Sequence, residues 1–145
     1  MDVSIERVSE ELGGIAVFGH RVLDQRDLVN EIRCGLPYDS LKTLMASFSI
    51  ANEEVAKPLG ISVTTIKRRK GSERLSASVS NNLLSLAQIA ALATDVLGNR
   101  EKASRWLHKP NRSLSGETPL SRLDTVLGYK EVESTLQRIA YGVFG

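Results

Sequence analysis

The sequence predicts an all-α protein, and three observations lead to that fold class. Apolar residues recur with the spacing of one helix face, i, i+3, i+4 and i+7. The clearest instance is Leu41, Leu44, Met45 and Phe48. Aromatic residues make up only 5% of the 145 residues, although strands are usually rich in them. The single segment that reads as a strand, residues 15–19, is short.

Composition indicates a globular protein of the cytoplasm. Hydrophobic residues make up 41% and charged residues 25% of the chain, close to the averages for soluble domains. The one cysteine, Cys34, excludes an internal disulfide and fits a reducing compartment. No apolar run approaches the ~20 residues that cross a bilayer, and the first residues lack the basic region of a secretory signal. We therefore expect a soluble, cytoplasmic protein with no membrane partner.

Charge is balanced overall but concentrated at one place. The formal net charge is +2; residues 1–75 carry 11 basic and 11 acidic side chains, and residues 76–145 carry 8 and 6. Four consecutive basic residues nevertheless occupy positions 67–70. Such a patch favours focused contact with an anion such as DNA. Cations that complement the dipole at a helix C-terminus are the alternative.

Residues 52–70 have the pattern of a helix-turn-helix. Ala56 is the small residue at which two helices can cross closely, and Gly60 supplies the turn. Ser62 fits the N-cap of the second helix, whose Ile66 would face inward. Pro58 in the first helix departs from the usual pattern, because proline removes a backbone hydrogen bond.

With Ile66 inward, the second helix would turn Val63, Thr64, Lys67 and Arg68 to the major groove. Thr65, Arg69 and Lys70 would meet the flanking DNA backbone. A helix pair with a purely structural role remains the alternative. The predicted DNA-binding residues are Val63, Thr64, Thr65, Lys67, Arg68, Arg69 and Lys70.

The serine-rich residues 71–80 are predicted to be an exposed connection between a front module, 1–75, and a back module, 76–145. The next helix, 81–97, is apolar on more than one face and ends at Gly98. We expect it to be central and buried, and to offer a surface for a homodimer.

The back module is predicted to contain three shorter helical segments. Residues 101–107 form a helix that Pro110 ends, and a polar loop with Leu114 as its apolar anchor follows. Thr118 and Pro119 fit the start of the next helix. Its inward residues are predicted to be Leu120, Leu123 and Leu127. Gly128 should separate that helix from the last one, whose apolar stripe is Val132, Leu136, Ile139 and Val143.

An ordered succession of residues in this module forms a long, specific motif. The motif comprises Ala103, Trp106, Leu107, Pro110, Asn111, Leu114, Gly116, Pro119, Leu120, Gly128, Val132, Leu136, Ile139, Tyr141 and Gly142. It resembles the toxin-binding domain of the Xre/MbcA/ParS antitoxins. The front half resembles the Xre-type helix-turn-helix domain that usually precedes it, with weaker motifs.

The resemblance implies a non-enzymatic partner of a RES-domain toxin, which attacks NAD and whose active site the antitoxin covers. It also implies a homodimer, a larger toxin-antitoxin assembly, and binding to an inverted repeat in the promoter of its own operon. Without the resemblance, Trp106 and the C-terminal tail would both be read as packing within the chain. With it, the expected toxin-binding residues are Trp106, Asn111, Leu114, Arg138, Tyr141, Gly142, Val143, Phe144 and Gly145.

No catalytic or metal-binding constellation is visible in the sequence. The two histidines, His20 and His108, lie in different modules without a ligand at metal-binding spacing. Cys34 ends an apolar helix and is predicted to lie in the core. We expect no enzyme activity and no cofactor. The alternative function is a helix-turn-helix regulator without a toxin, whose back half serves only dimerisation.

Overall fold

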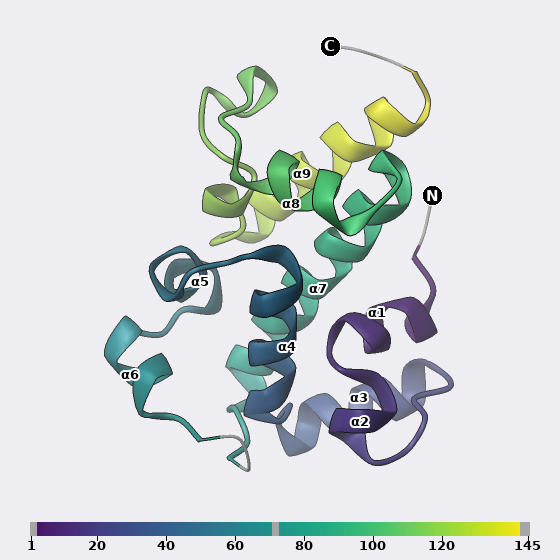
Figure 1. Cartoon of the computed structure of the whole chain (residues 1–145), viewed down its shortest axis with the longest axis vertical. Helices are drawn as coiled ribbons and strands as arrows, with labels where there is room; N and C mark the ends of the chain where they lie inside the picture. Colours follow the sequence, from purple (N-terminus) through teal and green to yellow (C-terminus); the bar gives the residue numbers. More distant parts are fainter. Residues whose placement is uncertain (1–2, 71–72, 143–145) are drawn as a thin grey trace.

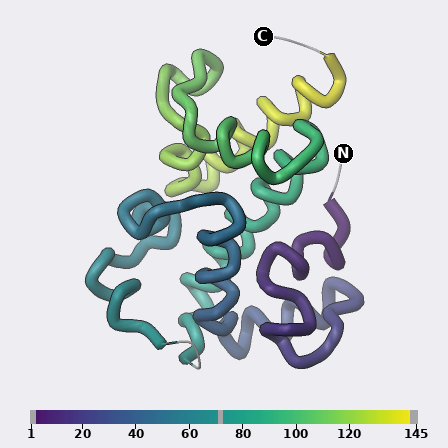
Figure 2. The backbone as a smooth tube through the Cα atoms, viewed as in Figure 1, coloured from purple at the N-terminus to yellow at the C-terminus, as the bar shows by residue number. Residues whose placement is uncertain are grey.

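The computed structural model describes residues 3–70 and 73–142, and it confirms the all-α class. Within these ranges the chain forms α-helices and two short 3-10 helices, with no strand (Figure 1 and, as a backbone trace, Figure 2). The helices are α1 (Ile5–Glu11), α2 (Gly14–Phe18), α3 (Gln25–Cys34), α4 (Tyr38–Phe48), α5 (Asn52–Leu59), α6 (Val63–Arg68), α7 (Ala77–Leu97), α8 (Arg100–His108), η1 (Arg112–Leu114), η2 (Leu120–Arg122) and α9 (Val126–Ala140).

The long helix α7 is the centre of the molecule, as the sequence predicts. Figure 1 shows it running through the middle, with helices from both ends of the chain around it. It packs against α1, α3, α4, α5, α8 and α9. Ser76 caps its start by accepting a hydrogen bond from the amide of Val79, 3.2 Å away, and Gly98 follows its end with φ 108°. The apolar faces expected to serve a homodimer are therefore covered within one chain.

The single segment that reads as a strand in the sequence, residues 15–19, forms most of a short helix and its C-cap. Residues 15–18 belong to α2, a five-residue helix that lies between Gly13 at φ 109° and Gly19 at φ 78°. These left-handed positions suit glycine, which has no Cβ to clash with the backbone. The two glycines let the chain turn sharply at each end of α2. Cys34, predicted to be buried, is exposed at the end of α3.

In its described part, residues 73–80, the expected connection is exposed at Glu73, Arg74, Ser76, Ala77 and Ser78, but its backbone is bonded to the rest of the protein. The amide of Leu75 donates to the carbonyl of Leu36 at 2.8 Å, and the amide of Tyr38 donates to the carbonyl of Glu73 at 2.9 Å. The Leu75 side chain is 2% exposed, and α7 has already begun at Ala77. This short segment therefore pairs with the turn before α4 instead of forming a linker.

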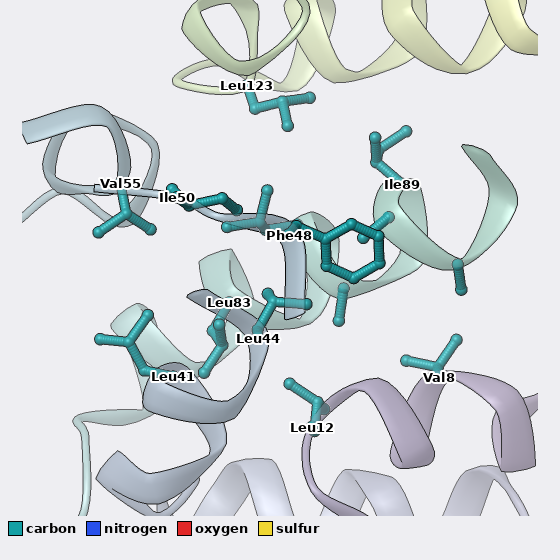
Figure 3. Packing of buried hydrophobic residues seen from close by; sticks show 14 of the residues in the cluster. Val8, Leu12, Leu41, Leu44, Phe48, Ile50, Val55, Leu83, Ile89 and Leu123 are labelled. Carbon is teal, nitrogen blue, oxygen red and sulfur yellow. The ribbon is translucent and has the colours of Figure 1, made fainter. Parts of the chain in front are cut away.

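One buried apolar cluster spans the front and back of the chain. In Figure 3, Val8 and Leu12 of α1 approach the same region as Phe48 of α4 and Ile89 of α7, and Leu123 reaches it from the back half. The boundary at residue 75 stays a prediction, since α7 contributes to the packing of both predicted modules.

A buried carboxylate links the first helix to the α7–α8 corner. The Glu11 side chain is fully buried, and its Oε1 lies 2.8 Å from Nη2 of Arg100, 89 residues away. Arg7 supplies a second cation to Glu11 at 3.5 Å and reaches Asp95 at 3.2 Å. The hydrogen bond to Glu11 raises the pKa of the Arg100 guanidinium. Removing one member of such a group leaves a buried polar partner unsatisfied.

We predict that Glu11→Gln lowers the free energy of unfolding by about 1.5–3 kcal/mol, since charged hydrogen bonds contribute about that much. Urea unfolding followed by circular dichroism measures the change. Glu10→Gln is the matched control, because the Glu10 side chain is 55% exposed; its effect should stay within about 0.5 kcal/mol. Equal effects of the two variants would show that the Glu11 contacts do not stabilise the fold.

Candidate functional site

The predicted helix-turn-helix is formed by α5 and α6. Gly60 ends α5 with φ 76°, and its amide donates to the carbonyl of Ala56 at 2.9 Å. Ser62 begins α6, and its Oγ accepts from the amide of Thr65 at 3.1 Å. Pro58 is buried in the last turn of α5, and the helix continues through it to Leu59. The turn and the cap therefore lie where the sequence predicts them.

A buried residue and a tyrosine fix the orientation of α6. Ile66 is 1% exposed, and its carbonyl accepts a hydrogen bond of 2.9 Å from the hydroxyl of Tyr38 on α4. The sequence predicted the inward Ile66 but not the contribution of Tyr38. With this face held against the protein, the opposite face of α6 is turned to solvent.

The outer face of α6 is cationic. Thr64, Lys67, Arg68 and Lys70 are exposed, whereas Val63, Thr65 and Arg69 are half-buried. Arg69 donates from Nη1 to the carbonyl of Arg74 at 2.9 Å, which holds it along residues 73–75. Thr65 Oγ1 lies 2.9 Å from Ser62 Oγ. Across residues 3–70 and 73–142, no carboxylate forms an ion pair with Lys67, Arg68 or Lys70.

The back half packs around α8 and α9. Ala103 and Leu107 of α8 are fully buried, and Trp106 is half-buried against the same core. The helix ends at His108, just before Pro110, as predicted. Half-burial leaves part of the indole accessible, so packing and partner contact are both compatible with the position of Trp106.

The polar loop after α8 is closed on itself around Asn111. Its Oδ1 accepts from the amide of Ser113 at 2.9 Å, and its carbonyl accepts from the amides of Leu114 and Gly116. Leu114 is fully buried, which confirms it as the apolar anchor of this loop. Any contribution of Leu114 to a partner surface would therefore come from the shape it gives the loop.

The start of the last helix differs from the prediction. Leu120 and Leu123 are buried as expected, but Leu127 is 73% exposed. Gly128 does not separate two helices: it lies in the first turn of α9, where its amide donates to Thr125 Oγ1 at 2.9 Å. A Cβ at Gly128 would overlap the carbonyl of Arg122. The glycine is therefore required for η2 to approach α9 closely.

The last predicted contact residues lie at the end of α9. Arg138 is exposed and donates from Nη2 to Thr135 Oγ1 at 3.3 Å. Tyr141 is 70% exposed, and Gly142 follows with φ 72°. Val143, Phe144 and Gly145 lie outside the described residues. The tyrosine side chain is therefore not packed into the core, as it would be if the tail served only internal packing.

Direct contacts join the helix-turn-helix to the back half. Glu54 of α5 lies 3.3 Å from Nε2 of His108, and Lys57 lies 3.4 Å from Asp124. Ser104 Oγ also donates to the carbonyl of Phe48 at 2.6 Å. The first helix of the helix-turn-helix thus rests on α8 and on the segment that follows η2.

The part of the chain that the structure describes has neither a cluster of metal ligands nor a membrane-spanning helix. Residues 3–70 and 73–142 contain no group of three histidine, cysteine or acidic side chains that could hold a metal ion. In the same ranges, no helix is both long and apolar enough to cross a bilayer.

The helix-turn-helix and the helical back half thus share one core and define a two-part, all-helical protein. Residues 27–88 match the family described as antitoxin Xre-like helix-turn-helix domain. Residues 92–142 match the family described as antitoxin Xre/MbcA/ParS C-terminal toxin-binding domain. The two matches meet within α7. The chain therefore belongs to the Xre/MbcA/ParS antitoxin family.

Three curated relatives named antitoxin Xre support this assignment. The chain is 40% identical to one from Pseudomonas putida over 57% of its own length and 52% of that protein. It thus spans about half of this relative. It is 28% identical to one from Yersinia enterocolitica over 81% of its own length and 80% of the relative. For one from Photorhabdus laumondii the identity is 27%, over 75% of each protein.

We predict that Gly128→Ala lowers the free energy of unfolding by about 1–3 kcal/mol, the usual cost of inserting a methyl group where there is no space. The added Cβ must push the Arg122 carbonyl, and with it η2, away from α9. Ser134→Ala, on the outer side of the same helix, is the control and should change stability by less than about 0.5 kcal/mol. Thermal unfolding of both variants tests the close approach; an unchanged Gly128→Ala would contradict it.

Proposed function

We propose that the chain is the antitoxin of a type II toxin-antitoxin system. Its back half binds a RES-domain toxin, an enzyme that consumes NAD, and thereby covers the active site of that toxin. Its front half represses the operon that encodes both proteins. The observation that carries this proposal is the pairing, in one chain, of a cationic helix-turn-helix with a domain of the toxin-binding family. The antitoxin itself needs no catalytic group and no cofactor. A cytoplasmic location follows from the two proposed partners.

The DNA-binding part of the proposal rests on the outer face of α6. Thr64, Lys67 and Arg68 are exposed on the side opposite to the buried Ile66, so the helix can enter a major groove without disturbing the core. Lysine and arginine reach phosphates or guanine, and threonine reaches base edges or a thymine methyl group. Val63 begins the same helix, and we assign Thr65, Arg69 and Lys70 to contacts with the flanking DNA backbone.

We predict that replacing Lys67 and Arg68 together by alanine weakens binding to the operon's own promoter at least about tenfold. The slope of log affinity against log salt should fall by about 0.9 for each phosphate that the variant no longer neutralises. Fluorescence anisotropy at several salt concentrations measures both. Replacing Lys102 and Lys109 by alanine removes the same charge from the exposed surface of the back half and should leave promoter binding intact. Unchanged binding by the α6 variant would mean that another face reads DNA.

A two-fold homodimer would match this mode of binding, since paired helix-turn-helix units read inverted repeats. Toxin would add further copies in a larger assembly. The second candidate is a regulator without a toxin, whose back half only dimerises. This candidate needs only the exposed cationic face of α6 and no toxin contact. A gene for a small RES-domain protein beside the antitoxin gene, and co-purification of the two products, would decide for the antitoxin.

Neutralisation is proposed to involve the end of α9 and the chain that follows it. A toxin that acts on NAD needs a cleft open to a charged dinucleotide, so an inhibitor has only to cover that entrance. Arg138 and Tyr141 are accessible at this end and combine two residue types enriched at binding hot spots. Val143, Phe144 and Gly145 follow in the sequence and belong to the same proposed contact. Gly142 has no side chain and permits close approach of the backbone to the toxin. Trp106, Asn111 and Leu114 form the second proposed contact region.

We predict that deleting residues 141–145 restores toxin activity in cells that co-express the toxin, while promoter binding survives. The deleted residues follow α9, so α5 and α6 keep their packing. Growth and cellular NAD measure neutralisation, and the full chain, which should protect the cells, is the reference. Circular dichroism distinguishes a folded variant that cannot bind toxin from one whose back half has unfolded. A well-folded truncation that still protects the cells would leave the Trp106–Leu114 region as the toxin contact.

A further inference from the structure

The outward face of α9 is a continuous stripe of accessible side chains. Its members follow helical spacing and comprise Leu127, Lys130, Ser134, Arg138 and Tyr141. The opposite face, with Val132 and Leu136, is fully buried. Between the stripe and η1 lies an open groove of about 490 Å³ that Ser113 borders on the η1 side. This groove is absent from the sequence prediction, which placed Leu127 in the core.

The groove is positively charged where it is accessible. Lys130 and Arg138 line it, and neither forms an ion pair with another described residue. The one carboxylate in its lining, Glu131, is bound by Nη2 of Arg122 at 2.6 Å. The other end of that guanidinium binds Glu117 at 2.7 Å. Arg122 thus pairs with Glu131 from outside the groove while also binding Glu117, and the two cations Lys130 and Arg138 remain available to a ligand.

An exposed aliphatic side chain lies at one end of this charged groove. Leu127 is 73% exposed and Val126 beside it is 72% exposed. Large apolar side chains this accessible are uncommon side by side on a solvated helix, whose outer face is usually polar. The combination of an aliphatic end and two cations without a carboxylate partner matches a protein surface better than a phosphate backbone. In Figure 1, α6 also lies well apart from α9, so the groove does not extend the proposed DNA-binding face.

We propose that this groove receives an acidic segment of the toxin. The inference rests on the proposed function and adds the surface and the chemistry of the partner. Lys130 and Arg138 are eight residues apart, which is ~12 Å along a helix. A complementary segment therefore carries two carboxylates at about that separation and an apolar side chain that covers Leu127. The charged pairs set orientation and speed association, and the apolar contact excludes water.

The contact is separate from closure of the toxin's active site by the tail. A helix face held by Gly128 against η2 offers a surface whose shape exists before the toxin binds, so little ordering is needed there. Arg138 would take part in both contacts, whereas Leu127 and Lys130 would serve binding and residues 141–145 would serve closure of the active site.

The experiment compares charge reversal at the groove with the same charge reversal elsewhere. The full-length chain carrying Lys130→Glu and Arg138→Glu is titrated with the purified RES-domain toxin encoded beside it, at low and high salt. Arg26→Glu with Arg33→Glu is the matched control, since both arginines are exposed and lie on α3, in the front half of the chain. Leu127→Ser tests the apolar end without a change of charge. Circular dichroism and promoter binding are measured for every variant.

We expect the Lys130/Arg138 reversal to weaken toxin binding at least tenfold at low salt, with a smaller effect at high salt, where charge repulsion is screened. Leu127→Ser should weaken binding at both salt concentrations, and the Arg26/Arg33 reversal should have little effect. Equal toxin binding by the natural chain and both groove variants would overturn this inference and leave the proposed function intact. So would a groove variant that loses promoter binding but keeps toxin binding, because the surface would then serve DNA. A natural chain that binds no toxin would overturn the proposed function and the inference with it.

Discussion

The burial of α7 is the constraint on which the rest of the structure depends. This helix has no acidic or basic residue between positions 77 and 94, so it can be surrounded without isolating a charge from water. Alanines 87, 90, 91 and 93 are all buried, and their small side chains let neighbouring helices approach closely. Helices from the front and the back of the chain both bury their apolar faces against α7. The front and back halves therefore share one hydrophobic core and do not each form a separate one.

This arrangement explains how one small chain can carry the two proposed binding surfaces. The side chains that form the core come from the inner faces of α4, α5, α6, α8 and α9, which leaves the outer faces of α6 and α9 free to differ. On α6 the outer face is cationic beside threonines, and on α9 it is cationic beside leucine and tyrosine. The first chemistry suits a nucleic acid, and the second suits a protein. Both surfaces can change in sequence with little effect on the core.

The contacts between α5 and the back half give the two surfaces a common base. Lys57 and Glu54 reach Asp124 and His108, and Asn82 of α7 donates to the carbonyl of Leu59 at 2.9 Å. A partner that displaced the segment around η2 would therefore press on the helix that supports α6. The buried Glu11–Arg100 contact adds a further attachment, between α8 and a helix that precedes the helix-turn-helix family match.

Patterns among residues close together in the sequence were enough to predict most of the helices and the helix-turn-helix. Apolar spacing predicted α4, α7, α8 and α9, and the set of Gly60, Ser62 and Ile66 predicted the helix-turn-helix. These predictions succeeded because helical periodicity, N-caps and left-handed glycines depend on residues within a few positions of each other. The ordered motif of the back half likewise led to the antitoxin family, because its residue types and spacings are readable without a structure.

The tertiary structure alone decided which side chains are covered. Leu75 is buried because Leu36 pairs with it, and Glu11 can be buried because Arg100, 89 residues away, meets it. The sequence predicted that Gly128 separates two helices. It lies inside α9 instead, where the Arg122 carbonyl leaves no space for a side chain. Leu127 looked like core, yet Thr125 starts α9 with Leu127 on its outer face. Burial depends on residues brought together from distant parts of the chain, and local spacing contains no information about which of them meet.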